Sequence, residues 1–547
     1  MYRWTLALIL AFGLAQAHPS TLVTALPPAT RITYLLPIEP DPYYTNVNGE
    51  VAELLYKPLI WINRKGEIDY ARSIATSVKT PDGEHYFIRL NPKWHWSDGV
   101  PVTSADVLFW LNLVRSIPLS KESLYGGWGG GGIPNDVVGD RALGPYALEI
   151  TLNRPYSSLW FIENGLGYLE PLPKHAWDRY PGHPARTLAW LEARGDNLSF
   201  FRHSPVDGPF MVGTFVNNLI YTFKANPHYD GHRPAYTTLA LRYFTTSDAE
   251  YQALRSGQVQ VGYLPLHLFE ERNIPGYRFA AVPSWSFNYI YINFANPKAP
   301  FLKELAVRQA LQMAINEPGM IRSLLHGQGV ADYAPAPFAP PTPYLDPRLR
   351  QGWVPYPYDP SKGRKILERV GWRLVHGIMR KGAAKLSLSL DYASGSTLAE
   401  QEAELVAEAA AREGIQIQLR PQPFDTLTAE LSSSRRWTLV YLNEPWYAFY
   451  PTSYGLLNSQ AAYNLGSYRN PEMDRLTEAT HAYGSLTAQL AALHRYQEYA
   501  ALRVPVLWMP DPYLLYEVSD SLVDVVRHIS PNGNWSPQYW SYRHRAP

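Results

Sequence analysis

The stretch Leu386–Leu419, LSLSLDYASGSTLAEQEAELVAEAAAREGIQIQL, predicts a β-strand, an α-helix and a second β-strand. Residues 386–390 (LSLSL) and 415–419 (IQIQL) alternate apolar and polar side chains, which is typical of half-buried strands. Between them, residues 400–413 are rich in Ala and Glu with apolar residues at helical spacing, and Gly414 supplies a helix stop. A connection of this length joins parallel strands, so we predict a βαβ unit.

Further regular elements are predicted on both sides of this unit. Downstream, residues 424–433 indicate a helix and residues 437–442 (WTLVYL) another strand. Upstream, residues 86–90 indicate a strand, and Thr103 followed by Asp106 three residues later is typical of a capped helix start. We therefore expect an α/β domain in the C-terminal half and a more strand-rich region before it.

Two stretches are predicted to be irregular. Residues 334–347 (APAPFAPPTPYLDP) are Pro-rich and favour an extended crossing on the protein surface. Residues 126–132 (GGWGGGG) favour a flexible loop, and no Lys-Ser/Thr pair follows that would make them a phosphate cradle.

Length and charge limit the class of protein. A chain of 547 residues exceeds what one hydrophobic core covers, about 250–300 residues, so two to four domains are expected. The 49 Lys and Arg residues nearly balance the 48 Asp and Glu residues, so no charge excess points to nucleic acid or to an anionic membrane surface. The chain has no Cys, which excludes disulfides, thiolate nucleophiles, Cys-based metal sites and a lipid-modified cysteine.

The N-terminus predicts an export signal over residues 1–17. Arg3 precedes the apolar run of residues 6–14 (LALILAFGL), and Ala15-Gln16-Ala17 forms a small-x-small cleavage site. The run is shorter than the roughly 20 residues of a membrane span. We expect a periplasmic mature protein that does not span the membrane; a buried N-terminal helix is the alternative interpretation.

Motifs typical of enzymes are weak in this sequence. His228 and His232 have the spacing of a zinc-peptidase helix, but Gly231 and the flanking Pro227 and Pro234 oppose a helix there. Neither a G-x-S-x-G elbow nor a G-x-G-x-x-G turn between a strand and a helix occurs. Paired acids of a glycosidase cannot be recognised without a fold. We predict no catalytic residue, no metal ligand and no cofactor.

Five segments carry a resemblance to a known family. They are WHWSDGVPVTSADVLFWL (94–111), SPVDGPFMVGTF with KANPHYDGHRP (204–234), NYIYINFANPKAPFLKELAVRQALQMAIN (288–316), YDPSKGRKILERVGW (358–372) and YRNPEMDRL (468–476). In the same order, they resemble segments of the bacterial extracellular solute-binding proteins of family 5, the periplasmic oligopeptide- and dipeptide-binding proteins of ABC importers.

The resemblance implies an α/β fold of the two-lobed periplasmic binding protein kind (type II, cluster C), with a hinge cleft and an extra inserted domain. Carried onto this chain, domain I (lobe I) comprises residues 28–57, 200–277 and 511–547. Domain II comprises residues 58–199, and domain III (lobe II) residues 278–510.

The resemblance also implies a function. The protein would capture short peptides by hinge closure and deliver them to the permease subunits of an ABC importer, as a monomer and without enzymatic activity. A solute that contacts both lobes favours the closed form, because only differential affinity shifts such an equilibrium. Two alternatives remain: the same fold binding an oligosaccharide or a metal chelate, and a secreted hydrolase.

The predicted ligand site departs from the family pattern at one position. Peptide-binding relatives pair the ligand's amino group with an Asp in a segment resembling G-W-x-A-D-Y-x-x-P. Here residues 443–452 match that segment, with Tyr447 at the Asp position and Glu444 at the Trp position. A phenol cannot replace a carboxylate as the partner of an ammonium group. Three explanations are open: Glu444 supplies the negative charge, the ligand lacks a free amino terminus, or the alignment is shifted. The plain alternative is that Glu444 is a solvated acid in a loop.

The predicted ligand-binding residues fall in three places. Aromatic rings near the expected lobe crossing and in the anchor loop can stack on a ligand, and amide side chains can bond to it. The residues are Trp285, Tyr289, Asn443, Glu444, Trp446, Tyr447 and Asn464.

Overall fold

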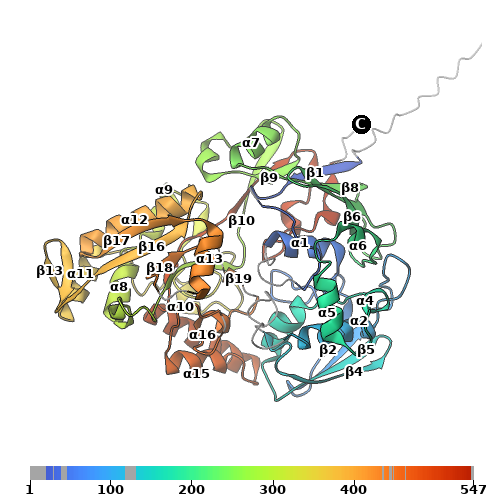
Figure 1. Ribbon diagram of the computed structural model, residues 1–547, viewed down its shortest axis with the longest axis horizontal. Helices are drawn as coiled ribbons and strands as arrows, with labels where there is room; N and C mark the ends of the chain where they lie inside the picture. Colours follow the sequence, from blue (N-terminus) through green and yellow to red (C-terminus); the bar gives the residue numbers. More distant parts are fainter. Residues whose placement is uncertain are drawn as a thin grey trace, which may run out of the picture.

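The computed structural model describes residues 20–28, 30–38, 46–117, 131–433, 436–442, 446–447, 449–461 and 463–543. The predicted signal peptide, Asn443, Glu444 and most of the glycine-rich stretch lie outside these residues. Two lobes are visible in Figure 1. We call the seven- and four-stranded sheets with their helices the first lobe, and the six-stranded sheet with its helices the second lobe.

The seven-stranded sheet gathers segments from both ends of the described chain. Its order is β10-β22-β9-β1-β8-β7-β6, and β1 pairs in parallel with β8. The sheet includes β1, which precedes residue 28, and most of β10, which follows residue 277, so it extends past the predicted limits of domain I. Its strands are β1 (Thr21–Ala25), β6 (Phe210–Val216), β7 (Ile220–Ala225), β8 (Thr238–Arg242), β9 (Val261–Tyr263), β10 (Tyr277–Val282) and β22 (Leu514–Ser519), with α7 (Ser247–Arg255) beside them.

The four-stranded antiparallel sheet follows α1 (Asn46–Leu55) in the chain. Its order is β2-β3-β5-β4, with β2 (Ala75–Lys79), β3 (His85–Leu90), β4 (Val137–Gly144) and β5 (Ala147–Leu152). The strand predicted at residues 86–90 is therefore confirmed. One continuous apolar core joins this sheet to the seven-stranded sheet, which makes the first lobe a single packed body.

Short helices complete the first lobe. The helix predicted after Thr103 is α2 (Ser104–Arg115), and the Asp106 carboxylate accepts hydrogen bonds from the Thr103 amide at 2.8 Å and hydroxyl at 3.0 Å. The others are α3 (Ser158–Trp160), η3 (Phe161–Gly165), η4 (Leu166–Tyr168), α4 (Lys174–Trp177), α5 (Pro184–Glu192) and α6 (Leu198–His203).

The second lobe contains the predicted βαβ unit. Strand β16 (Ser387–Ala393) runs parallel to β17 (Gln416–Gln422), and α12 (Thr397–Glu413) connects them. Gly414 ends the helix in the left-handed region, with φ of 84°, which favours glycine. The predicted helix and strand downstream are α13 (Phe424–Ser433) and β18 (Leu439–Tyr441). The α/β fold predicted from local patterns is thus confirmed in this lobe.

The six-stranded sheet has the order β17-β16-β18-β11-β19, with β20 also paired to β11. Strand β11 is buried along its whole length at the centre of the second core. The remaining strands and the larger helices are β11 (Ser286–Ile292), β19 (Trp446–Tyr447), β20 (Leu507–Met509), α8 (Leu305–Met313), α9 (Glu317–Ser323), α11 (Pro360–Arg369), α15 (Pro471–Ala479) and α16 (Leu486–Arg503).

The described chain passes between the seven- and six-stranded sheets twice. The first crossing, residues 283–285, joins β10 to β11, and the second, residues 510–513, joins β20 to β22. The start of the first crossing lies beside the end of the second, because Val282 and Leu514 pair in the antiparallel β10–β22 ladder. Two adjacent crossings are the arrangement that a hinge between two lobes requires.

The Pro-rich stretch is not a surface crossing, and that expectation is wrong. Ala334, Ala336 and Leu345 are buried against Ala501 of α16. The Gln497 side chain accepts a hydrogen bond from the Asp346 amide at 2.8 Å and donates one to the Tyr344 carbonyl at 3.0 Å. Proline has no amide hydrogen, so this segment brings few backbone N–H donors into the interior. The side chain of Gln497 helps to satisfy the backbone groups that are buried.

None of the helices within the described ranges is long and apolar enough to cross a membrane.

Candidate functional site

Four residues from distant parts of the chain form a ring of contacts where the two lobes meet. Trp285, in the first crossing, is fully buried, and its amide donates to the Pro531 carbonyl at 2.6 Å. Its indole contacts Phe449 edge-on, with 6.5 Å between centroids, and Phe449 lies 5.8 Å from Tyr168. Asn532, which follows Pro531, closes the ring: its side chain lies near the Tyr168 hydroxyl and opposes the rise in pKa that burial causes there. We call Trp285, Phe449, Tyr168 and Asn532 the junction ring.

A tight turn near the C-terminus places Asn532 in this ring. The Ser530 amide donates to the Asn534 carbonyl at 2.7 Å, and the Gly533 amide donates to the Ser530 carbonyl at 3.0 Å. Gly533 has φ of 87°, a conformation that side chains disfavour. The guanidinium of Arg64, in the first lobe, donates to the Ile529 carbonyl at 3.1 Å. The turn therefore has a fixed shape where it contacts the first lobe and the first crossing.

Two glutamates of α1 hold the other side of this turn. Glu50 accepts a hydrogen bond from the Trp535 amide at 3.0 Å, and Glu53 accepts one from the Asn534 side chain at 2.6 Å. Burial raises the pKa of Glu50 to about 8 and that of Glu53 to about 7, against the lowering effect of these hydrogen bonds. Both carboxyls therefore retain their proton to a higher pH than a solvent-exposed glutamate does.

The lobes also touch on the side away from the crossings. Ser157 of the first lobe donates from its hydroxyl to the Gln489 side chain and from its amide to the His481 carbonyl, both at 2.7 Å. The indole of Trp160 stacks on the imidazole of His481, with ring centroids 4.2 Å apart. Burial lowers the pKa of His481 to about 3, so this imidazole is neutral in the stack.

Two further pairs extend these contacts, which we call the far-side contact. The Asn164 side chain donates to the Tyr450 carbonyl at 2.8 Å and accepts from the Tyr450 amide at 3.1 Å. The Tyr344 hydroxyl, from the Pro-rich stretch, donates to the Glu163 carboxyl, whose pKa is raised to about 8 by burial. The far-side contact thus joins the first lobe to three separate segments of the second.

Acidic side chains cluster beside the crossings. The Ser286 hydroxyl donates to the Asp511 carboxyl, so one side-chain hydrogen bond ties the start of β11, directly after the first crossing, to the second crossing. Burial raises the pKa of Asp511 to about 7. Burial and the charges of Asp511 and Glu317 raise the pKa of Asp332, which accepts a hydrogen bond from the Asn288 amide at 3.3 Å.

The predicted site residues are distributed unequally around the junction ring. Trp285 belongs to it. Trp446 and Tyr447 form strand β19, which pairs with Phe287 and Ser286, so their backbone runs beside the first crossing. Tyr289 is buried within the second lobe, and its hydroxyl lies 3.0 Å from that of Tyr291.

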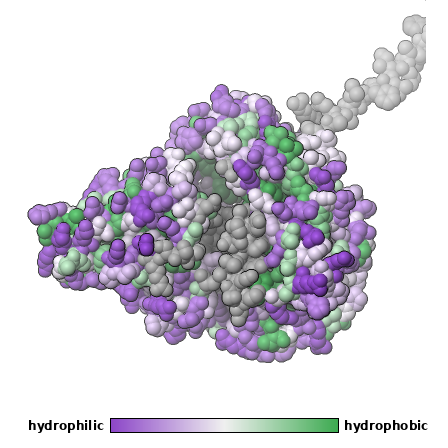
Figure 2. All heavy atoms as spheres, in the orientation of Figure 1, coloured by the Kyte–Doolittle hydropathy of each residue, from purple (hydrophilic) through white to green (hydrophobic). Residues whose placement is uncertain are grey.

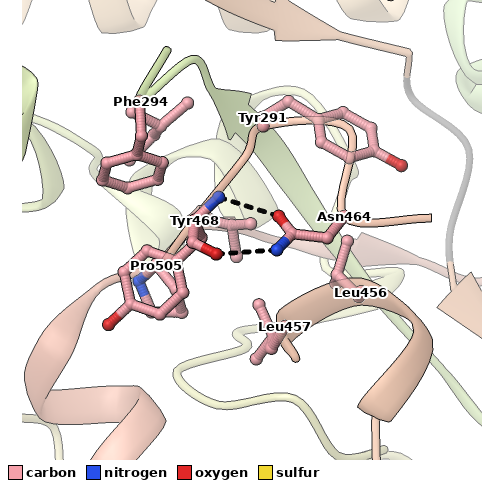
Figure 3. Close-up of a pocket in the computed structure, with 10 residues that line it drawn as sticks. Tyr291, Phe294, Leu456, Leu457, Asn464, Tyr468 and Pro505 are labelled. Atoms are coloured by element: carbon pink, nitrogen blue, oxygen red, sulfur yellow. Dashed lines mark hydrogen bonds between the residues drawn. The ribbon is translucent and has the colours of Figure 1, made fainter. Parts of the chain in front are cut away.

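Asn464 lies in a separate loop of the second lobe (Figure 3). Its side-chain nitrogen donates to the Tyr468 carbonyl at 2.7 Å and to the Asn458 carbonyl at 3.1 Å, and its oxygen accepts from the Tyr468 amide at 2.8 Å. The adjoining cavity, lined in part by Leu456 and Leu457, measures about 10 Å³, room for one water molecule. Asn464 holds its own loop together, and a contact with ligand stays a prediction.

The sequence interpretation missed Tyr168, Phe449, Asn532 and Glu53. Asn532-Gly533 is a turn signal that could have identified the loop, but nothing local places it against residues more than 80 positions away. Glu53 and Tyr168 lie in segments whose patterns indicate only helix and irregular chain.

In the part of the chain that the structure describes, no group of three or more His, Cys, Asp or Glu residues is placed to hold a metal ion. His232 instead stacks on Tyr539, with ring centroids 4.8 Å apart. A hollow between the lobes, with hydrophobic side chains on its wall, is visible in Figure 2.

The profile described as "Bacterial extracellular solute-binding proteins, family 5 Middle" matches residues 69–465. The chain therefore belongs to this family of extracellular solute-binding proteins, as the ordered motifs predicted.

Similar proteins come from several bacteria. Relatives in Brucella species, whose names place them among ABC transporter peptide-binding proteins, are 29% identical over 335 residues, which is 59% of this chain and 56% of the Brucella ovis protein. The chain spans about half the length of these curated relatives. It is 25% identical to the oligopeptide-binding protein AppA of Bacillus subtilis over 440 residues, 79% of this chain and 76% of that protein.

Solved structures share the fold over almost the whole chain. AppA of Bacillus subtilis in complex with a nonapeptide superposes with a TM-score of 0.76 at 19% identity, covering 96% of this chain and 99% of that one. NikA of Brucella suis in complex with Fe(III)-EDTA gives a TM-score of 0.77 at 18% identity, covering 96% and 100%. The two-lobed binding-protein fold predicted from the sequence is confirmed.

Proposed function

We propose that this protein is the periplasmic substrate-binding component of an ABC importer. It captures a short peptide between its lobes, closes around it and presents the closed form to the permease subunits. Membership of the solute-binding family supports this role, as do relatives named for oligopeptide binding. Its domains are those inferred from the sequence with β1 and β10 added to domain I, and the hinge lies at residues 283–285 and 510–513.

The observation that carries the proposal is the junction ring. Its members come from the first crossing, the segment before α14 (Tyr454–Leu457), the first lobe and the C-terminal turn. A solute that contacts this ring contacts both lobes at once, which is what closure by ligand binding requires. Aromatic faces and amide groups together suit a peptide, whose main chain is polar and whose side chains are often apolar.

Calorimetry tests the proposal directly. The protein is unfolded, washed free of carried-over ligand, refolded and titrated with a mixed-sequence library of di- to pentapeptides. We expect saturable heat and a smaller radius of gyration by small-angle scattering after saturation. Absence of heat with every peptide length would remove the peptide function.

A metal chelate is the second candidate ligand. A nickel-binding periplasmic protein of Escherichia coli is 26% identical to this chain over 423 residues, 74% of this chain and 72% of that protein. The NikA structure contains an iron chelate in the same fold. Mass spectrometry of the solute released from the purified protein distinguishes the two, because a chelate carries its metal and a peptide fragments along its backbone.

A further inference from the structure

Positive charge is concentrated in one short segment of this chain. Residues 362–385 (KGRKILERVGWRLVHGIMRKGAAK) contain eight Lys or Arg residues and a single acid, Glu368, so their net charge is +7. The rest of the chain has 41 Lys or Arg residues against 47 Asp or Glu residues, a net charge of −6. The near-zero charge of the whole chain therefore conceals one strongly basic segment.

This segment folds as α11 followed by a small antiparallel sheet of order β13-β14-β15. The strands are β13 (Arg373–Val375), β14 (Ile378–Lys381) and β15 (Ala384–Lys385). In Figure 1, α11 and β13 lie at the end of the second lobe farthest from the first lobe. Figure 2 shows that the molecule tapers towards this end. The segment therefore forms a tip, away from both regions where the lobes meet.

The strand register places three cations directly opposite one another. Arg373 pairs with Arg380, and Arg380 pairs with Lys385, so their side chains lie on one face of the small sheet. All three residues are exposed. Like charges directly opposite each other across strands are destabilising. A negatively charged partner would relieve this repulsion.

A second row of cations lies on α11. Lys362, Lys365 and Arg369 are exposed, and their spacing of three and then four residues places them on one face of the helix. Like charges four residues apart, such as Lys365 and Arg369, are also destabilising. Two neighbouring elements thus share the same uncompensated charge. We call the six cations of the two rows the basic tip.

Acids close to the basic tip are paired with other cations. Glu368 pairs with Arg364 at 3.2 Å, and Glu304 pairs with Lys381 at 3.0 Å. The guanidinium of Arg373 donates to the carbonyls of Glu368 and Trp372, which carry no net charge. Within the described part of the chain, no cation of the basic tip forms an ion pair with a carboxylate.

Apolar side chains are exposed beside these cations. Val370, Leu374 and Val375 have exposed fractions of 40%, 38% and 39%. Val375 pairs with Ile378 two positions along from the Arg373–Arg380 pair, so it lies on the same face as the row of cations. Figure 2 shows hydrophobic residues among hydrophilic ones at this end. The tip therefore combines charge and apolar surface.

This combination suits the surface of an anionic bilayer. Its headgroups attract Lys and Arg, and its interface accommodates apolar side chains. A broad surface of headgroups can also meet cations that are spread over a helix and a sheet, which a small soluble anion cannot.

We propose that the basic tip binds the surface of a membrane that contains anionic phospholipids. The cations meet the lipid phosphates, and Val375 with its apolar neighbours enters the headgroup region. This inference goes beyond the proposed function and does not depend on which solute the protein carries.

Vesicle flotation of the full chain tests the proposal. The probes are vesicles of phosphatidylcholine mixed equally with phosphatidylglycerol, and vesicles of phosphatidylcholine alone. We expect the wild type to bind the anionic vesicles at least about 100-fold more tightly. Raising the salt from about 0.1 M to about 1 M should abolish that preference, because the Debye length falls from about 10 Å to about 3 Å.

Neutral substitutions in the strand row locate the binding surface. The triple variant Arg373→Gln, Arg380→Gln, Lys385→Gln should bind anionic vesicles about 100-fold more weakly than the wild type, since each Lys or Arg at an anionic surface contributes a factor of about five. The apolar run of residues 6–14 is the same in every variant, so the comparison between variants cancels its contribution.

The matched control removes the same charge from the first lobe. Lys79, Arg89 and Lys224 are exposed on β2, β3 and β7. The triple variant Lys79→Gln, Arg89→Gln, Lys224→Gln should bind anionic vesicles within about twofold of the wild type, because charges far from the contact are screened. Far-ultraviolet circular dichroism confirms that both triple variants are folded.

The strand row gives a second readout that needs no membrane. Arg380→Gln removes its central member, so added salt should raise the urea midpoint of the wild type more than that of this variant. Equal sensitivity to salt would mean that the row carries no uncompensated repulsion, and it would overturn the argument for an anionic partner.

The flotation results decide the partner. Equal binding of the wild type to both kinds of vesicle, wild-type binding by the strand-row variant, or an equal loss in the first-lobe control overturns the proposal. Polyglutamate serves as a soluble acidic competitor. If it binds the wild type and not the strand-row variant while anionic vesicles bind neither, the partner is an acidic protein and the membrane assignment is wrong.

Discussion

The two regions where the lobes meet are built differently. At the crossings, covalent chain passes twice between the lobes, beside a β-ladder and the Ser286–Asp511 hydrogen bond. At the far-side contact, only side chains and isolated backbone groups touch, as in the Trp160–His481 stack. The crossings must survive any movement of the lobes, whereas the far-side contact can separate without breaking a sheet. A strong connection on one side and a separable contact on the other are what the proposed hinge closure requires.

The size of the far-side contact supports this contrast. Each of its hydrogen bonds contributes about 0.5–1.5 kcal/mol net, and the ring stack adds about 0.5–1.5 kcal/mol. Five such hydrogen bonds and one stack give a total of about 3–9 kcal/mol, comparable to the roughly 5.5 kcal/mol by which a solute must favour one state to reverse a two-state equilibrium. Breaking the contact selectively is therefore the sharpest way to test the comparison.

The largest effect is expected for Trp160→Ala. Trp160 is buried at the far-side contact, and removing such a ring costs about 3–5 kcal/mol of unfolding free energy. Because the ring also stacks on His481 across the lobes, the variant should have a larger radius of gyration as well. Urea unfolding and small-angle scattering measure the two quantities.

Trp177→Ala is the matched control for that variant. Trp177 is equally buried, but it packs within the first lobe, 5.7 Å from the ring of Tyr56. It should lose a similar amount of stability and keep the wild-type radius. Equal radii for both variants would mean that the far-side contact does not hold the lobes together.

The next effect concerns the crossings and depends on pH. Asp511 has a pKa of about 7 in the folded protein against an ordinary value of 3.8. Between about pH 4 and pH 7 the native state retains a proton that the unfolded state has released. Ionisation of this group therefore lowers the unfolding free energy as pH rises, by up to ~1.4 kcal/mol per pH unit. The decline levels off above pH 7.

Asp511→Asn should abolish that decline. The difference in unfolding free energy, variant minus wild type, should grow from pH 4 to pH 7 and then stay constant in urea titrations. Ser286→Ala removes a hydrogen bond that lowers the pKa of Asp511. In this variant the decline in unfolding free energy should therefore extend to higher pH. Parallel pH profiles for wild type and Asp511→Asn would contradict the burial of an un-ionised acid in the second crossing.

The smallest effect is expected at the Glu163–Tyr344 pair of the far-side contact. Tyr344→Phe leaves the buried Glu163 carboxyl without its donor and should cost about 1–3 kcal/mol. A double-mutant cycle with Glu163→Gln should give a coupling of about 0.5–3 kcal/mol. Tyr86→Phe is the control, because the buried hydroxyl of Tyr86 has no hydrogen-bond partner among the residues that the structure describes. A coupling near zero would show that the pair contributes nothing to closure.

Local patterns predicted the second lobe well because its elements obey short-range rules. The parallel β16–β17 pair, α12 and the Gly414 stop follow from alternation, helical spacing and one residue able to adopt positive φ. The same rules failed for the Pro-rich stretch. Proline content predicted its irregular backbone, but burial depends on Gln497, about 150 residues away, which provides the hydrogen bonds.

The candidate site was predicted only in part, for a related reason. Trp285 could be placed near a lobe crossing from the order of the motifs. Its neighbours Phe449, Tyr168 and Asn532 carry no shared local pattern, because the ring they form with Trp285 is made entirely of contacts between distant segments.

The sequence by itself determined the family, the α/β class and most of the regular elements tested, because periodicity, caps and ordered motifs are encoded within a few turns of chain. Only the tertiary structure decided which buried polar atoms lack partners and where the lobes touch. Those properties depend on desolvation and on distances between residues hundreds of positions apart, and no local pattern of residues encodes either.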